Sequence, residues 1–327
     1  MELGAFKVII TSEARKLALE YGFSPLKVQR IIEILGEREA RELLRYVNEV
    51  RPLKSIRCNT LAIGLEELVK RMSNLGFKLR IVNWIPNALV VLEERRSLGS
   101  TIEYLAGYYY IQGLASMLPV HIMKPRPGEI VADLAAAPGG KTTQLAQEMR
   151  NKGVIVAVEK SSARVKALIS NIQRMRVRNA IVLNIDMMNL NLNNMFNKVL
   201  LDAPCSGEGL IHVDFRVRLK SDPKEFIKLS NIQYKMLSRA VDYVKPGGII
   251  VYSTCSLAPE ENEYVITRVV EGRRDVRVEP TRFGSKGSPG IRYFCGVEFP
   301  SYVDNCLRLY PHRDGTEGFF ICILRRM

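Results

Sequence analysis

The sequence predicts an α/β domain built on a parallel sheet with helices on both faces, preceded by a smaller helical and α+β region. First, short apolar runs alternate with helical patterns from residue 130 to residue 252, which is typical of parallel sheets. Second, an Ala- and Gly-rich turn at 133–143 joins the first run to the first helix, where small residues let a ligand approach the backbone. Third, 327 residues leave room for a sizeable core and an accessory domain.

The first fifty residues predict a small helical bundle. Ser12 can cap a helix that Gly22 closes, and Ser24 with a following proline opens a second helix that Gly36 ends. A third helix is expected at 37–49, with leucines and a valine in one stripe. Its arginines lie away from that stripe and give basic faces, which we interpret mainly as solvated surfaces and as a candidate RNA contact: Arg38, Arg41 and Arg45.

The next segment predicts a small α+β module and a linker. The module has a strand at 56–61, a helix at 65–74 and two short apolar runs at 79–82 and 89–92. Residues 99–123 hold several tyrosines and Gln112 and predict a connecting helix, followed by a Pro-rich entry to the catalytic part. We place the domain boundary near residue 110.

From residue 130 onward, the sequence predicts alternating strands and helices and then a terminal pair of strands. Ser161 is expected to cap the helix after the second strand, and a helix is expected at 259–271. Two last strands separated by a Pro- and Gly-containing turn resemble an antiparallel hairpin. The predicted strands are 130–132, 154–158, 181–185, 198–201, 248–252, 306–309 and 318–324, and the predicted helices 144–149 and 223–244 complete the pattern.

Charge and cysteine content limit the classes of function. The net charge of +14 and the pI near 9.6 favour a polyanionic partner, with nucleic acid ahead of a membrane surface. No 18-residue apolar stretch exists, and residues 1–10 lack the features of a signal peptide, so we expect a soluble, cytoplasmic protein without membrane contact. The six cysteines form no Cys-x-x-Cys pair and no histidine lies at metal-ligand spacing to them, so we expect reduced thiols and no metal site.

The turn at 133–143 leaves two interpretations open. The pattern from Ala135 to Thr142 is one glycine short of a Walker A phosphate loop, and Asp202 could hold magnesium. The alternative is a nucleoside pocket. Glu159 ends the second strand, where a carboxylate can accept both ribose hydroxyls, and Asp186 ends the third, where it can accept from an adenine amino group. A phosphate-loop enzyme needs neither acid, so the pair favours a cofactor that carries adenosine.

Two cysteines follow neighbouring strands and should meet in one pocket. Cys205 lies in Asp202-Ala-Pro-Cys-Ser-Gly, and Cys255 lies in Ser-Thr-Cys-Ser. Carbon 5 of a pyrimidine is a weak nucleophile, but a thiolate added to carbon 6 makes it reactive enough to take a methyl group from a sulfonium donor. Asp202 could hydrogen-bond the ring, and Lys141 could favour the thiolate. A second thiol could assist release of the product.

From about Arg51 to the C-terminus, the chain resembles the Sun family of RNA cytosine-5 methyltransferases. The stretches that carry the resemblance are the turn at 133–143 and the two cysteine motifs. The resemblance implies that Cys255 is the nucleophile and that Cys205 helps to break down the covalent adduct. It implies S-adenosylmethionine as cofactor, with Glu159 on the ribose, Asp186 at the adenine and Asp202 as the acid of the fourth motif. The cofactor loop then falls on Ala135, Ala136, Ala137, Pro138, Gly139, Gly140 and Lys141.

The resemblance also implies a domain plan and a substrate. Residues 111–327 resemble a class I, Rossmann-like, S-adenosylmethionine-dependent methyltransferase domain, and residues 1–110 an N-terminal RNA-binding region. The chain resembles the compact archaeal members, which act on transfer RNA. We therefore expect a monomeric enzyme of tRNA processing, with ribosomal RNA as the alternative substrate. A P-loop NTPase and a non-catalytic RNA-binding protein are the contrasting hypotheses.

Overall fold

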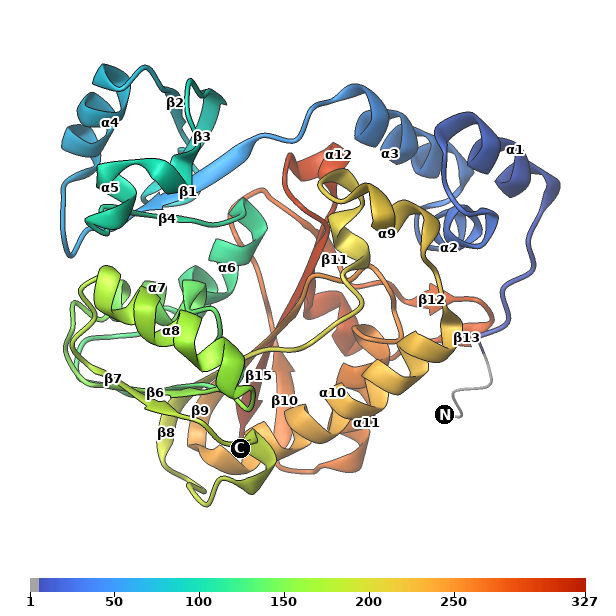
Figure 1. Cartoon of the computed structure of the whole chain (residues 1–327). Helices are drawn as coiled ribbons and strands as arrows, with labels where there is room; N and C mark the ends of the chain where they lie inside the picture. The colour runs from blue at the N-terminus through green and yellow to red at the C-terminus, as the bar shows by residue number, and fades with distance from the viewer. Residues whose placement is uncertain (1–5) are drawn as a thin grey trace. The chain divides into compact units, whose positions relative to one another are not determined.

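The computed structural model describes residues 6–327, which divide into two compact units (Figure 1). We call residues 53–202, 239–252 and 326–327 the parallel-sheet unit, and residues 6–52, 203–238 and 253–325 the cysteine unit. Each unit is built from separated stretches of the chain. The functional boundary near residue 110 stays a prediction. Within residues 6–327, no helix is both long enough and apolar enough to cross a membrane.

The main sheet of the parallel-sheet unit confirms the α/β prediction. Its strands run parallel in the order β8-β5-β6-β7, and the first part of β9 lies beside β8. Helices α7 and α8 lie side by side and contact β6 and β7, as Figure 1 shows. The elements are β5 (Ile130–Asp133), α7 (Gly140–Glu148), β6 (Val154–Val158), α8 (Ser162–Arg174), β7 (Ala180–Leu183), η3 (Met187–Asn189), β8 (Phe196–Asp202) and β9 (Val244–Thr254).

A second, four-stranded sheet forms the predicted α+β module in the same unit. Its order is β2-β3-β1-β4, and β1 pairs antiparallel with β3 and β4. Helix α4 packs on it through residues such as Leu68 and Met72, both fully buried. The elements are β1 (Lys54–Cys58), α4 (Leu65–Asn74), β2 (Lys78–Ile81), β3 (Ala88–Glu93), η2 (Leu98–Ser100), α5 (Ile102–Leu105), β4 (Tyr109–Ile111) and α6 (Leu114–Met123).

The cysteine unit begins with the three predicted helices, α1 (Ser12–Tyr21), α2 (Pro25–Leu35) and α3 (Glu37–Glu49). The cap of α1 differs from the prediction, because Thr11 and not Ser12 accepts a hydrogen bond from the third residue beyond it. Ser24 caps α2 as expected. Arg41, predicted on a basic face, forms ion pairs with Glu13 and Glu20.

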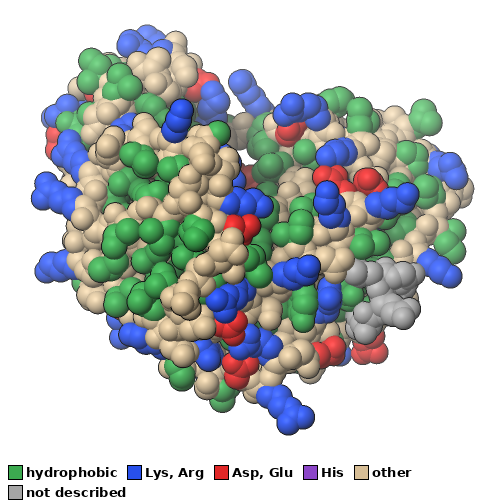
Figure 2. All heavy atoms as spheres, turned by 60° about the horizontal axis from the view of Figure 1, so that its bottom comes forward, with side chains coloured by type: hydrophobic (Ala, Val, Ile, Leu, Met, Phe, Trp, Pro, Cys, Tyr) green, Lys and Arg blue, Asp and Glu red, His purple; other side chains and the backbone are tan. Residues whose placement is uncertain are grey.

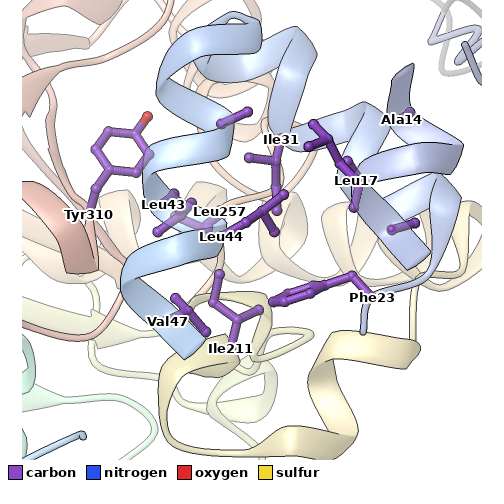
Figure 3. Packing of buried hydrophobic residues seen from close by; sticks show 13 residues of the cluster. Ala14, Leu17, Phe23, Ile31, Leu43, Leu44, Val47, Ile211, Leu257 and Tyr310 are labelled. Carbon is purple, nitrogen blue, oxygen red and sulfur yellow. The ribbon is translucent and has the colours of Figure 1, made fainter. Parts of the chain in front are cut away.

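The apolar stripe of α3 is covered by residues from much later in the chain. Leu43 and Leu44 are fully buried, and burial of each contributes roughly 1.5–3 kcal/mol. Figure 3 shows Ile211, Leu257 and Tyr310 beside the side chains of the three helices. The N-terminal helices therefore share one core with the segments that follow the two cysteine motifs.

The rest of the cysteine unit combines helices with an antiparallel sheet. Strand β14 pairs with β15 and with β11, and β10 pairs with β15, which confirms the predicted terminal hairpin. The elements are η4 (Glu208–His212), α9 (Phe215–Leu219), α10 (Pro223–Tyr243, up to residue 238 in this unit), α11 (Glu263–Gly272), β10 (Val276–Glu279), β11 (Ser288–Pro289), β12 (Tyr293–Phe294), β13 (Val297–Glu298), η5 (Ser301–Asn305), β14 (Leu307–Leu309), α12 (Pro311–Asp314) and β15 (Phe319–Arg326).

Three local predictions were wrong. Tyr109 lies in strand β4, not in a connecting helix, because it pairs with Cys58 of β1. The Ser161 side chain does not cap α8; instead its backbone N–H donates to Glu159 at 2.8 Å. Helix α11 starts at Glu263 rather than at 259, since hydrogen bonds hold the preceding residues in a turn.

Candidate active site

The turn after β5 forms one wall of a cavity in the parallel-sheet unit. The cavity has a volume of about 270 Å³ and is lined by Tyr110, Ile111, Gln112, Gly113, Ser116, Asp133, Ala135, Ala136, Ala137, Pro138, Gly140, Lys141 and Asp202. Small side chains leave the backbone of the turn accessible. A Cβ atom on Gly140 would lie 3.2 Å from the Tyr110 ring, so a larger residue there would crowd the cavity wall. All predicted loop residues except Gly139 line the cavity.

A three-residue polar cluster lies at this cavity. The Lys141 ammonium lies 2.7 Å from Asp202 Oδ2 and donates to Ser116 Oγ at 2.9 Å. Lys141 follows the glycines on α7, and Asp202 is the last residue of β8. The cluster places a carboxylate and a cation together at the carboxyl ends of the strands, where open α/β sheets bind their ligands.

Asp133 is the buried carboxylate of the cavity. Thr142 Oγ1 donates to its Oδ2 at 2.7 Å, and burial raises the pKa of Asp133 to about 6. The carboxyl group can therefore change its protonation state near neutral pH. It ends β5, as the sequence predicted.

The two predicted nucleoside acids follow the expected strands, Glu159 directly after β6 and Asp186 three residues after the end of β7, and both have protein partners. Glu159 is buried, accepts a hydrogen bond from the Ser161 backbone and forms an ion pair with Arg164 at 3.3 Å. Asp186 accepts from the Met188 backbone and caps η3. Among the described residues, the lining of the 270 Å³ cavity includes neither acid. Their roles at a ribose and an adenine stay predictions.

The cysteine motifs meet in the cysteine unit. Cys205 Sγ and Cys255 Sγ lie 2.8 Å apart, and the Cys255 backbone N–H points at Cys205 Sγ at 3.2 Å. Both side chains are partly exposed, and both are free thiols. The predicted meeting of the two cysteines is confirmed.

Hydrogen bonding between these thiols affects their protonation. The hydrogen bond to Cys255, followed by burial, raises the pKa of Cys205 well above its ordinary value. Cys205 therefore keeps its proton at neutral pH. Either sulfur can be the donor in the hydrogen bond between the two thiols.

Close backbone packing joins the two motif segments. The Gly209 N–H donates to the Cys255 carbonyl at 2.8 Å, and the Gly318 N–H donates to the Gly209 carbonyl at 2.9 Å. A Cβ atom on Gly209 would lie 1.9 Å from the Gly318 oxygen. Only glycine fits at this position, which lies two residues beyond the glycine that ends the first cysteine motif.

Comparison with known proteins gives the family. Residues 120–325 match the family model described as 16S rRNA methyltransferase RsmB/F, and residues 26–114 match that of the N-terminal domain of 16S rRNA methyltransferase RsmF. The chain belongs to the RsmB/F methyltransferase family. The membership confirms the resemblance to Sun family RNA cytosine-5 methyltransferases, and with it the class I methyltransferase fold.

Individual known proteins are similar to nearly the whole chain. The 25S rRNA (cytosine-C(5))-methyltransferase nop2 of Schizosaccharomyces pombe is 38% identical over 314 residues, which are 94% of this chain and 51% of that protein. A methyltransferase homologue from Pyrococcus horikoshii has a TM-score of 0.84 and 38% identity, covering 97% of this chain and all of that one. NSun6 from Pyrococcus horikoshii, solved with SFG, has a TM-score of 0.79 and 25% identity over 91% of this chain and 97% of that one. The chain spans about half the length of the curated relatives it matches.

Arg57 holds the loop predicted to bind the cofactor, and the sequence did not indicate this contact. This buried residue of β1 donates to the Gly140 carbonyl at 3.2 Å and to Thr143 Oγ1 at 2.8 Å. It also donates to Gln112 Oε1 at 3.0 Å. The bonds tie the small sheet of this RsmB/F chain to the start of α7. The sequence predicted a strand at 56–61, but a lone arginine in it gave no signal of its partners.

Basic side chains of this RsmB/F chain are spread over the face that Figure 2 shows. On the face shown in Figure 2, Lys and Arg side chains are scattered, with Asp and Glu side chains between them, rather than gathered in one patch.

Proposed function

We propose that the protein transfers a methyl group from S-adenosylmethionine to carbon 5 of a cytosine in RNA. The observation that carries the proposal is the contact between Cys205 and Cys255 in a chain of the RsmB/F family. One thiol would suffice for a nucleophile. Two thiols in contact, one of them kept protonated, suit a covalent reaction in which the nucleophile must also leave.

The cavity of the parallel-sheet unit is the proposed cofactor site, and its residues fit the group. A cavity of about 270 Å³ with a loop of small residues on one side can hold a nucleoside, and the Asp133 and Asp202 carboxylates can receive a cationic amino acid. S-adenosylmethionine, when bound, supplies an electrophilic methyl group. The SFG that accompanies NSun6 supports a ligand site in this family. Under this proposal the loop 135–141 cradles the cofactor, and Glu159 and Asp186 hold its adenosine.

The thiols supply the covalent chemistry in this proposal. The Cys255 thiol gives up its proton to solvent and its sulfur bonds to carbon 6 of the cytosine, so that the electron pair of the 5,6 double bond becomes available at carbon 5 for the methyl group. Solvent water then takes the proton from carbon 5, the bond between sulfur and carbon 6 breaks, and the ring is restored. The departing Cys255 sulfur takes the proton that Cys205 carries beside it, and Cys205 regains a proton from solvent.

Asp202 and Lys141 have proposed supporting roles. Asp202 accepts a hydrogen bond from the amino group of the cytosine and orients the ring for addition of the thiol. Lys141, which pairs with Asp202 at 2.7 Å, keeps that carboxylate oriented. In the sequence, Asp202 lies three positions before Cys205.

Two RNA classes are candidate substrates. Transfer RNA is our first proposal, because the sequence resembles the compact archaeal members of the family. Ribosomal RNA is the second, and the names of the family model and of the nop2 relative favour it. In either case the RNA is the polyanion that the net charge of +14 indicates.

Incubation of the protein with labelled S-adenosylmethionine and separate pools of transfer and ribosomal RNA tests the proposal. We expect 5-methylcytosine in transfer RNA. Label confined to ribosomal RNA would select the second substrate, and label in neither pool would contradict the activity. Magnesium-dependent ATP hydrolysis without methyl transfer would instead support the phosphate-loop hypothesis.

A further inference from the structure

One buried carboxylate, Glu261, connects the two cysteine segments. It lies in the turn before α11 and is fully buried. Its Oε1 accepts hydrogen bonds from Ser206 Oγ at 2.5 Å and from Ser256 Oγ at 2.7 Å. These serines directly follow Cys205 and Cys255 in the chain. A single oxygen atom therefore receives one hydroxyl from each cysteine motif.

The second oxygen of Glu261 fixes the first motif further. Oε2 accepts from the Ser206 backbone N–H at 2.9 Å and from Gln233 Nε2 at 2.8 Å. Gln233 also donates to the Pro204 carbonyl at 2.9 Å. The residues on both sides of Cys205 are thus held by Glu261 and by the glutamine that it orients.

The second motif is held from the same turn. Thr254 Oγ1, just before Cys255, donates to Asn262 Oδ1 at 2.6 Å, and Asn262 Nδ2 donates to the Ser256 carbonyl at 2.9 Å. The two serine hydroxyls also lie 3.1 Å from each other. Residues 261 and 262 therefore restrain the chain before and after Cys255.

We propose that Glu261 is a positioning residue that keeps the Cys205 and Cys255 thiols in contact by bridging Ser206 and Ser256. The proposal rests on the proposed function for its catalytic meaning, since the contact lets Cys205 pass its proton to the departing Cys255 sulfur. Glu261 itself touches neither substrate nor cofactor in this account. Its effect on turnover comes through the geometry of the thiols.

Disulfide exchange measures the proximity of the thiols without any methyl transfer. Glutathione disulfide oxidises the pair, forming one Cys205–Cys255 bond and releasing two molecules of reduced glutathione. The equilibrium constant, read by peptide mapping after acid quenching, reports the effective concentration of one thiol at the other. Cys306 and Cys322, whose sulfurs lie 2.7 Å apart in the same unit, serve as an internal reference pair.

Four variants separate positioning from general damage. Glu261→Ala and the double variant Ser206→Ala with Ser256→Ala remove the bridge from opposite sides. Glu261→Gln keeps one oxygen, which can accept from the Ser206 backbone N–H and from Gln233, and its amide nitrogen in the place of Oε1 can donate to the two serine hydroxyls. Ser230→Ala is the matched control, because this buried serine bonds only to the Ile227 carbonyl of its own helix among its described hydrogen bonds.

We expect Glu261→Ala and the double serine variant to lower the Cys205–Cys255 exchange constant at least tenfold, and Glu261→Gln and Ser230→Ala to lower it less than threefold. Turnover on RNA should follow the same order through kcat, with KM for RNA unchanged. An exchange constant that neither bridge-removing variant changes would overturn the proposal. If the wild-type chain transfers no methyl group while the exchange constants still follow this order, the proposed function fails and the positioning role stands.

Discussion

The cysteine unit contains two pairs of thiols with nearly the same sulfur separation and different surroundings. Cys205 and Cys255 lie 2.8 Å apart, and Cys306 and Cys322 lie 2.7 Å apart. The first pair follows strands and is partly exposed, whereas Cys306 and Cys322 are 1% and 0% exposed. Distance between sulfur atoms alone therefore does not distinguish a reactive pair from a packed one.

The two pairs of thiols differ in the hydrogen bonds of the residues beside them. The first pair is bordered by Ser206 and Ser256, which share the Glu261 carboxylate. Cys306 precedes β14 and Cys322 lies in β15, and burial is the main cause that raises the pKa of Cys306. Buried thiols of this kind behave as small hydrophobic side chains. The comparison supports a catalytic role for the pair of Cys205 and Cys255 and a packing role for the pair of Cys306 and Cys322.

Removal of one sulfur from each pair gives the largest expected contrast. Cys255→Ala should lower RNA methylation by at least ~1000-fold, because it removes the sulfur that bonds to carbon 6 of the cytosine in the proposed reaction. Cofactor binding, measured by calorimetry, should remain within threefold of the wild type. Cys322→Ala should keep more than half of the activity. Equal activity losses in the two variants would remove the distinction between the pairs.

Cys205→Ala should have the second largest effect and a different outcome. The Cys255 sulfur can still add to cytosine, but the proton donor for its release is gone. We expect turnover to fall by ~100-fold and a covalent protein–RNA adduct to accumulate. A denaturing gel with labelled RNA measures the adduct, and the double variant with Cys255→Ala should show none. A gel without adduct for Cys205→Ala alone would remove the product-release role.

Alkylation under native conditions should separate the pairs by accessibility. Partly exposed thiols react from the folded state, whereas Cys306 and Cys322 must wait for local or global opening. Iodoacetamide followed by peptide mapping should label Cys205 or Cys255 at least ~10-fold faster than the buried pair. The difference should vanish in denaturant, which controls for intrinsic reactivity. Equal native rates would mean that the unit opens too readily for burial to protect a thiol.

Local patterns in the sequence predicted several secondary-structure elements and the contact between Cys205 and Cys255. The strand at 154–158 and the helices at 65–74 and 37–49 have the expected bounds, because apolar periodicity and flanking glycines or charges define them locally. The meeting of Cys205 and Cys255 followed from their places after neighbouring strands. It needed no knowledge of packing.

Long-range hydrogen bonds were beyond sequence reasoning. Residues 259–262 have a helical pattern, yet they form a turn because Asn262 bonds to Thr254 and Glu261 bonds to both cysteine segments. Similarly, nothing in its neighbours indicates that Arg57 reaches the Gly140 carbonyl, 83 residues away. Polar residues in such positions look like ordinary surface residues until the tertiary partners are known.

The smallest expected effect is a stability difference that depends on pH. The raised pKa of Cys306 lets the folded protein keep a proton that the unfolded chain loses above about pH 9. Its contribution is therefore fully present below that pH and is lost as pH rises, by up to ~1.4 kcal/mol per pH unit. Cys306→Ala removes this titration, so its free energy of unfolding should fall less steeply than that of the wild type between pH 8 and pH 10. Urea unfolding at several pH values measures both slopes. Ser230→Ala is the control, because this substitution removes no titratable group. Parallel curves for the wild type and Cys306→Ala would mean that the thiol ionises as easily in the folded protein as in the unfolded chain.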